Sequence, residues 1–368
     1  MRKISMANPV FNGNEKKYLM ECIDTGWVSA NGRFVNEFEK CFAEFCGCKY
    51  ALSCSNGTVS LHLILAALGI GAGDEVIVPD LTYVATANAV RYCGATPVFA
   101  DSQEGTFNID PLQIEKKITS HTKAIMPVHL YGLPADMEKI MDIAEKHGIS
   151  VIEDAAEAHG AECNGKKVGQ FGIATSFSFF GNKIITSGEG GMVVTNDEKL
   201  YQRMKLLKGQ AVSPHKRYWH IDVGYNYRMT NMQAAVGLGQ LEKISWHIAQ
   251  RERVASLYKK YLDTYKEYVK LQEEPSGYRS VYWMNNVILS DKVLAERDKI
   301  MEKMEEKGIE MRPVFYPMHI MPPYHDDTAS FPIAEKLAAR EISLPSHAGL
   351  SEEDIQYVCD SLIQCIEG

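Results

Sequence analysis

Short apolar runs alternate with amphipathic helical patterns along the first two thirds of the chain. The apolar runs are rich in β-branched residues, as in buried strands, and turns separate them from stretches of about ten to fifteen residues with helical periodicity. This alternation predicts βαβ units and an α/β fold with a mostly parallel sheet. The expected strands are residues 75–79, 97–101, 124–129 and 150–153, and the expected helices are 59–68, 82–92 and 136–147.

The pattern changes after about residue 245, where a long charged helix is expected over residues 248–265. We therefore expect a large domain with an N-terminal arm over residues 1–247 and a smaller C-terminal α/β domain over residues 248–368. The elements expected in the smaller domain after the long helix are strands at 282–289 and 310–315 and helices at 293–307 and 351–366.

Composition excludes several classes of protein. The chain has 368 residues, of which 45% are apolar and 23% charged, and its net charge is −8 without a basic stripe. No nucleic-acid partner is therefore expected. No apolar run reaches the ~18 residues of a membrane span, and the N-terminus lacks the apolar segment of a signal peptide. These features predict a cytoplasmic protein without membrane contact.

Nine cysteines are scattered along the chain. Cys41, Cys46, Cys48 and Cys54 lie closest together, but their spacings lack the paired C-x2-C pattern of a zinc site. We interpret them as reduced, mostly buried thiols, and we expect no metal.

Lys183 is the most informative residue of the pattern. It follows the apolar run 176–180 and precedes the glycine-rich turn 188–191. An isolated lysine there could extend to solvent or pair with a carboxylate. If it is desolvated instead, its pKa falls and the amine becomes a nucleophile, as Schiff-base chemistry requires. The glycines would leave room for a flat ring.

Ligands of open α/β sheets bind beyond the carboxyl ends of the strands. Three further positions follow strands or precede a helix and are expected near that edge of the sheet, as Lys183 is. Asp154 could cap a helix or accept a hydrogen bond from a protonated ring nitrogen. Residues 55–58, Ser-Asn-Gly-Thr, could cap the next helix or bind a phosphate. Tyr83 could belong to the core or lie on a planar cofactor. With Lys183, these groups match the requirements of pyridoxal 5′-phosphate (PLP).

At this point the chain resembles the PLP-dependent sugar-nucleotide aminotransferases, a DegT-like family with the aspartate-aminotransferase fold (fold type I). The resemblance implies a large, mixed but mostly parallel sheet domain followed by a smaller α/β domain. It covers nearly the whole chain, through SNGTVSLHL, GDEVIVPDLTY, PVHLYG, VIEDAAEAHGA, SFSFFGNKIITSGEGG and GYNYRMTNMQAA.

The resemblance also assigns roles to single residues. It implies that Lys183 is the catalytic Schiff-base lysine, that Asp154 pairs with the ring nitrogen and that Tyr83 stacks on the ring. Glu157 stands near the ring hydroxyl, where many relatives carry glutamine, so the details of that contact stay open. The remaining implied contacts are Gly57, Thr58 and Ser178 at the phosphate and Asn226 at the phosphate of the partner subunit in a homodimer.

Within the family, the segments FFGNK, KGQ and RPVFYPMHIMPPY are most similar to members that aminate C4 of GDP-4-keto-6-deoxy-D-mannose with L-glutamate. Their product, GDP-perosamine, serves lipopolysaccharide O-antigen biosynthesis. Arg217, Tyr316 and His319 are expected to contact the sugar or the nucleotide. A UDP- or dTDP-linked 4-keto-6-deoxyglucose is the alternative substrate.

Two other functions are disfavoured. A sugar 3-dehydratase of this kind would carry histidine in place of Lys183. A non-catalytic regulator would not need the intact lysine, aspartate and phosphate motif.

Overall fold

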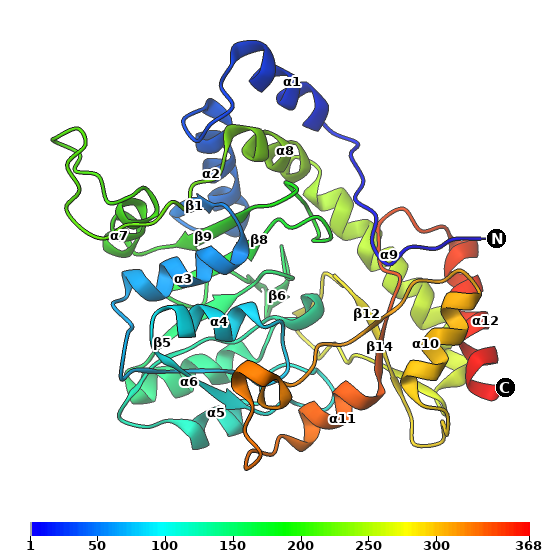
Figure 1. Cartoon of the computed structure of the whole chain (residues 1–368). Coiled ribbons are helices and arrows are strands. Elements are labelled where there is room, and N and C mark those ends of the chain that lie inside the picture. The colour runs from blue at the N-terminus through cyan, green and yellow to red at the C-terminus, as the bar shows by residue number, and fades with distance from the viewer. Residues whose placement is uncertain (1) are drawn as a thin grey trace.

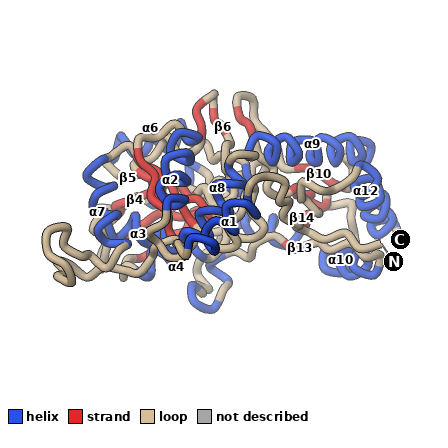
Figure 2. Tube along the Cα trace, turned by 90° about the horizontal axis from the view of Figure 1, so that it is seen from above, coloured by secondary structure: helices blue, strands red, loops and turns tan. Residues whose placement is uncertain are grey.

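The computed structural model describes residues 2–368. Two parts of unequal size lie side by side, each around its own sheet (Figure 1). Seen from above, the larger part holds most of the strands, and helices α9 (Ile244–Leu262), α10 (Arg297–Glu306) and α12 (Glu352–Glu367) surround the smaller sheet (Figure 2). The N-terminal segment reaches the smaller part, where Ile4 forms a parallel bridge with Ile309.

The larger sheet has seven strands in the order β1-β9-β8-β5-β4-β2-β3. The strands from β8 through β5, β4 and β2 to β3 are parallel, whereas β9 is antiparallel to both β8 and β1. This mixed, mostly parallel sheet confirms the predicted fold class. Its strands are β1 (Tyr50–Cys54), β2 (Glu75–Pro79), β3 (Thr96–Ala100), β4 (Thr122–Ile125), β5 (Ser150–Asp154), β8 (Ala174–Ser178) and β9 (Gly191–Thr195).

Helices cover both faces of this sheet because its strands are apolar on both sides. In β2, Val76 and Val78 pack in the cluster of α3 (Gly57–Ala67) and α4 (Ala85–Tyr92), whereas Ile77 packs in that of α5 and α6. The other helices of this part are α1 (Glu15–Thr25), α2 (Arg33–Cys46), α5 (Pro111–Lys117), α6 (Met137–His147), α7 (Glu198–Lys208) and α8 (Asn231–Leu241), with a 3-10 turn at Leu130–Gly132.

The smaller sheet is antiparallel, in the order β10-β12-β14-β13. Its strands are β10 (Val269–Leu271), β12 (Asn285–Leu289), β13 (Arg312–Pro313) and β14 (Glu341–Leu344). The helices are α9 (Ile244–Leu262), α10 (Arg297–Glu306), α11 (Pro332–Arg340) and α12 (Glu352–Glu367), with 3-10 turns at Asp263–Tyr265, Met318–Ile320 and Pro322–Tyr324. A third, short sheet joins β11 (Tyr278–Arg279), β6 (Glu162–Cys163) and β7 (Lys166–Lys167).

Helix α9 links the two parts as one continuous element. Ile244 and Ile248 belong to the core of the larger part, and Val254 and Tyr258 belong to that of the smaller part. The predicted boundary at residue 247 therefore falls inside a helix, and the division into two domains there stays a prediction.

Most expected elements are present, with different ends. The expected strand 124–129 stops at Ile125, because Val128 forms only an isolated bridge with Asp154 and His129 turns its ring to Glu153. The expected strands 282–289 and 310–315 shorten to β12 and β13. Among residues 2–368, no helix is long and apolar enough to cross a membrane. All nine cysteines are free thiols.

Candidate active site

A cavity of about 590 Å³ lies beyond the carboxyl ends of the parallel strands, where the smaller part meets the larger sheet. This is the edge at which open α/β sheets bind their ligands. Of the predicted cofactor residues, the structure brings seven together on its wall and leaves Asn226 outside. The seven are Gly57, Thr58, Tyr83, Asp154, Glu157, Ser178 and Lys183.

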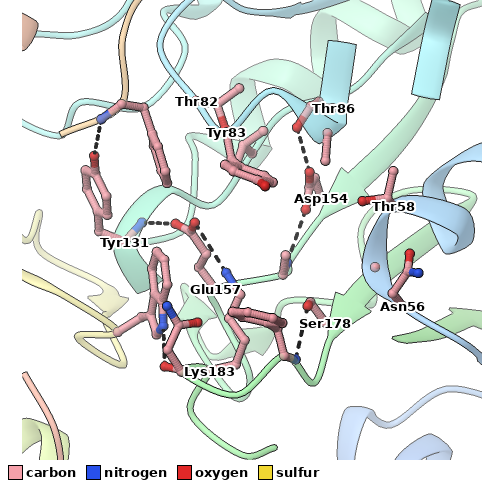
Figure 3. A pocket seen from close by; sticks show the side chains of 18 of the residues that line it. Asn56, Thr58, Thr82, Tyr83, Thr86, Tyr131, Asp154, Glu157, Ser178 and Lys183 are labelled. Atoms are coloured by element: carbon pink, nitrogen blue, oxygen red, sulfur yellow. Dashed lines mark hydrogen bonds and ion pairs between the residues drawn. The ribbon is translucent and has the colours of Figure 1, made fainter. Parts of the chain in front are cut away.

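Lys183 lies in the loop between β8 and β9, and 12% of its side chain is exposed. Its Nζ is 3.6 Å from Oε1 of Glu157 (Figure 3). The same atom is 3.7 Å from the centre of the Trp283 ring. Burial lowers the pKa of Lys183, while the charges of Glu157 and Asp154 act in the opposite direction. The amine is thus desolvated and also paired with a carboxylate. Both of these interpretations of Lys183, which the sequence presented as alternatives, therefore apply.

Asp154 ends β5 and is buried. Its Oδ2 accepts a 2.8 Å hydrogen bond from Oγ1 of Thr86, and its Oδ1 accepts one of 3.2 Å from the N–H of Ala156 (Figure 3). No helix begins after Asp154, so the helix-cap interpretation is wrong. Burial raises the pKa of Asp154, and the hydrogen bonds from Thr86 and Ala156 lower it. A cationic group in the cavity would stabilise this carboxylate further.

Glu157 lies in the loop after β5 and faces Lys183. Its Oε2 accepts a 2.7 Å hydrogen bond from the N–H of Tyr131, which fixes the carboxyl group with Oε1 toward the amine. The side chain is 3% exposed, and burial raises the pKa of Glu157 to about 7, although Lys183 and the Tyr131 N–H act to lower it. This pKa lies close to neutrality, so Glu157 can gain or lose a proton there.

The start of α3 forms the opposite wall. Asn56 caps the helix by accepting a 3.0 Å hydrogen bond from the N–H of Val59, so neither the serine nor the threonine of the motif is the cap. Gly57 lies so close to Ser178 that a Cβ added to it would stand 2.9 Å from the Cβ of Ser178. The free N–H groups of a helix N-terminus beside Thr58 and Ser178 suit a phosphate.

Tyr83 is 58% exposed and lines the cavity, so the alternative that it is a core residue is wrong. Its ring is tilted against that of Phe315, with centroids 5.7 Å apart. It therefore presents a flat aromatic group at the edge of the cavity (Figure 3).

The other predicted residues lie outside the cavity wall. Asn226 is exposed and accepts a 3.1 Å hydrogen bond from Arg228. Arg217 is on the exposed loop after α7, which projects from the molecule in green (Figure 1), and Tyr316 is 51% exposed. His319 is buried, with its Nδ1 2.7 Å from Oδ2 of Asp80 and its backbone N–H donating to Oδ1. This position makes His319 a structural partner of Asp80 rather than a wall residue.

Sequence reasoning missed several residues of the wall. Thr86, Trp283 and Arg312 all line the cavity with Lys183. They come from α4 and the smaller part, and no local pattern marks them. Only packing between distant segments shows their role.

The residues present fit pyridoxal phosphate. Gly57 leaves space that a Cβ would fill, at a helix end suited to a phosphate. Asp154 offers a buried carboxylate for a protonated ring nitrogen, and Lys183 offers an amine whose pKa is lowered. Within residues 2–368, no group of three or more His, Cys, Asp or Glu side chains is arranged to hold a metal ion.

The chain belongs to the DegT/DnrJ/EryC1/StrS aminotransferase family, which matches residues 10–363. It is accordingly a PLP-dependent aminotransferase. It is 53% identical over 365 residues to the GDP-perosamine synthase of Caulobacter vibrioides, covering 99% of this chain and 98% of the relative. It is 48% identical over 362 residues to the GDP-perosamine synthase of Escherichia coli O157:H7, covering 98% of each.

A solved structure agrees in fold. Helicobacter pylori PseC, an aminotransferase involved in the biosynthesis of pseudoaminic acid, superposes with a TM-score of 0.95 at 30% identity, over 100% of both chains. The similarity therefore extends over both the larger and the smaller part.

Proposed function

We propose that this protein transfers the amino group of L-glutamate to C4 of GDP-4-keto-6-deoxy-D-mannose and thereby forms GDP-perosamine. The observation that carries the proposal is the buried Lys183–Glu157 pair beside Asp154, in a chain 53% identical to a GDP-perosamine synthase. When bound, PLP supplies the electron sink that such a transfer needs.

Lys183 is the proposed nucleophile and proton carrier. Burial lowers its pKa, so a larger fraction of the amine is neutral at physiological pH than in water. A neutral Nζ can attack a carbonyl carbon and can later accept a proton from a neighbouring C–H group. Glu157, 3.6 Å away, can hold the proton that Nζ releases.

Asp154 is the proposed partner of the ring nitrogen. Its carboxylate, oriented by Thr86 and the N–H of Ala156, would accept a hydrogen bond from a protonated pyridine nitrogen. Gly57, Thr58 and Ser178 would bind the phosphate at the other end of the ring. Tyr83 would cover the ring at the cavity edge.

We infer that two copies of the chain complete each site. The loop after α7 exposes large apolar side chains that monomeric proteins usually bury, with Tyr218 79%, Trp219 54% and Val223 81% exposed. Asn226 lies at the base of this loop, outside the cavity of its own chain. A second copy that covers the loop would give Asn226 a phosphate to bind in the partner's cavity.

The nine free thiols support a reducing compartment, and we place the reaction in the cytoplasm.

A substrate panel tests the function. The purified enzyme with PLP and L-glutamate should convert GDP-4-keto-6-deoxy-D-mannose to GDP-perosamine, detected by mass spectrometry and NMR. UDP- and dTDP-4-keto-6-deoxyglucose serve as the alternatives. Turnover of only a UDP- or dTDP-linked sugar would refute the assignment.

A further inference from the structure

Trp283 is an aromatic residue of the cavity wall that none of the roles above uses. It belongs to the smaller part, two positions before β12, and is 5% exposed. Nζ of Lys183 lies 3.7 Å from the centre of its ring. A cation this close to an indole face is attracted by the ring quadrupole, and tryptophan attracts cations most strongly among the aromatic side chains. The amine therefore has a second partner besides Glu157.

The N–H of the same ring fixes the backbone next to the amine. Nε1 of Trp283 donates a 2.8 Å hydrogen bond to the carbonyl oxygen of Asn182, the residue before Lys183. A buried tryptophan usually finds such a partner for its N–H group. One side chain of the smaller part thus constrains both the peptide group from which Lys183 extends and the position of its amine.

Tyr131 holds Trp283 and Glu157 in one arrangement. Its ring lies nearly parallel to that of Trp283, with 17° between the planes and 6.3 Å between the centroids. Its carbonyl oxygen accepts a 3.4 Å hydrogen bond from the N–H of Met284, and its own N–H donates to Oε2 of Glu157 (Figure 3). The same residue therefore positions both partners of the amine, the indole face and the carboxylate.

The two backbone segments that meet here are strained. Tyr131 has a φ of 60°, and Tyr282, which precedes Trp283, has a φ of 46°. Residues with a Cβ rarely adopt positive φ, and such conformations persist where surrounding contacts hold them, often at functional sites. The packing is also close, since a Cβ added at Gly132 would stand 2.9 Å from the backbone N of Trp283. Contacts between the two parts thus hold the indole ring against the amine.

The ring differs in kind from the charged groups around Lys183. The charged side chains that line the cavity with it are Asp154, Glu157, Glu189 and Arg312. Burial lowers the pKa of the neighbouring His159 to about 3, so this ring is neutral in the physiological range. Glu157 attracts the ammonium only while it is ionised, and its pKa is raised to about 7. An indole face attracts a cation without titrating, so its attraction does not depend on pH.

We propose that Trp283 binds the free amine of Lys183, with its ring face at the ammonium form and its N–H at the preceding peptide group. This inference deepens the proposed function, because it concerns the amine that is proposed to carry the proton. The ring has no site that accepts a proton, so the ammonium is held there without losing its proton to the ring. Whenever Lys183 is not bound covalently, its amine is thus kept at one place in the cavity, beside Glu157.

Fluorinated tryptophans in the cofactor-free protein test this inference without turnover. Fluorine atoms on the indole withdraw the electrons that attract a cation, whereas the N–H and the overall shape of the ring are kept. The pKa of Lys183 should fall stepwise from tryptophan through monofluoro- and difluoro- to trifluorotryptophan, by about half a unit or more in total. Acylation of Lys183 as a function of pH, followed by mass spectrometry, measures this pKa.

A control variant separates Trp283 from the other tryptophans. The chain has four tryptophans, so the same fluorinated residues are incorporated into Trp283→Phe, where they should leave the pKa of Lys183 unchanged. An unchanged or rising pKa along the fluorinated series, or an equal fall in Trp283→Phe, would each overturn the proposal. A wild type without glutamate-dependent turnover would contradict the proposed function alone, because the acylation series does not depend on turnover.

Discussion

The amine of Lys183 lies 3.6 Å from Oε1 of Glu157, in a cavity where both side chains are almost fully buried. Burial disfavours the charged form of each group, and the attraction between the two opposite charges favours it. The net effect is a lowered pKa of Lys183 and a pKa of Glu157 raised to about 7. A lysine in this position therefore has a larger neutral fraction at a given pH than an exposed lysine, whose pKa is near 10.5.

Replacing Lys183 with alanine should abolish the reaction. Without the amine, there is no nucleophile and no proton carrier in the cavity, so glutamate-dependent turnover should fall by about 10³-fold or more. Steady-state kinetics with the GDP-linked keto-sugar measure this change. Lys199→Ala, an exposed position on α7, should retain wild-type turnover. Equal turnover by Lys183→Ala would exclude the assigned role.

Glu157→Gln should shift the proton equilibrium of Lys183. The Glu157 charge raises the pKa of the buried amine, so its removal should lower that pKa further and leave more neutral amine at a given pH. In the cofactor-free protein, acylation of Lys183 by an amine-specific reagent, followed by mass spectrometry, should reach its half-maximal rate at a lower pH, by about one unit. Acylation of Lys199 serves as the internal reference. An identical pH profile would show that Glu157 does not set the charge of Lys183.

Thr86→Val should act through Asp154. The hydroxyl of Thr86 stabilises the Asp154 carboxylate, so its loss should raise the pKa of Asp154. Because the ionised carboxylate is the active form, activity should be lost at a higher pH on the acid side in Thr86→Val than in the wild type. Asp154→Asn should lose activity at all pH values, by about 10²-fold or more. The pH–rate profiles of both variants test this, and an unshifted acid limb in Thr86→Val would contradict it.

Gly57→Ala should weaken cofactor binding. An added Cβ would stand 2.9 Å from the Cβ of Ser178 and push apart the two walls proposed to bind the phosphate. We expect the Kd for PLP to rise by about 10-fold or more. Gly181→Ala is the matched control, since a Cβ there would meet no atom within 4 Å. Equal PLP affinity of the two variants would show that the close approach at Gly57 is unimportant.

His319→Ala should affect stability more than substrate binding. It would leave the buried Asp80 without its side-chain partner, which should lower the free energy of unfolding by about 3 kcal/mol. Urea denaturation measures this loss, with the exposed His325→Ala as the control. The KM for the nucleotide sugar should change by less than about twofold. A large rise in KM with unchanged stability would instead support the sequence-based expectation that His319 contacts the substrate.

Local patterns were sufficient to predict the sheet edge and its main residues. The apolar run before Lys183, the strand that ends at Asp154 and the motif before α3 each occupy a few consecutive residues, and parallel topology brings their ends together. Patterns of this kind could not show that Tyr83 is exposed, because an aromatic residue after a strand is compatible with either environment.

The remaining wall residues depend on contacts between distant parts of the chain. Trp283 and Arg312 reach the cavity only because the smaller part packs against the sheet, and Thr86 reaches Asp154 across 68 positions of sequence. His319 shows the reverse case, in which a histidine in a family-like motif pairs with Asp80 in the core. Local sequence patterns do not show which residues pack or form hydrogen bonds with one another when they are far apart in the chain.

Chemical trapping of the cofactor tests the assigned site most directly. Borohydride reduction of the PLP-loaded enzyme, followed by proteolysis and mass spectrometry, should locate the cofactor on Lys183. In Lys183→Ala the modified peptide should be absent. Cofactor attached to another lysine, or no covalent attachment in the wild type, would contradict the assignment of this cavity as the active site.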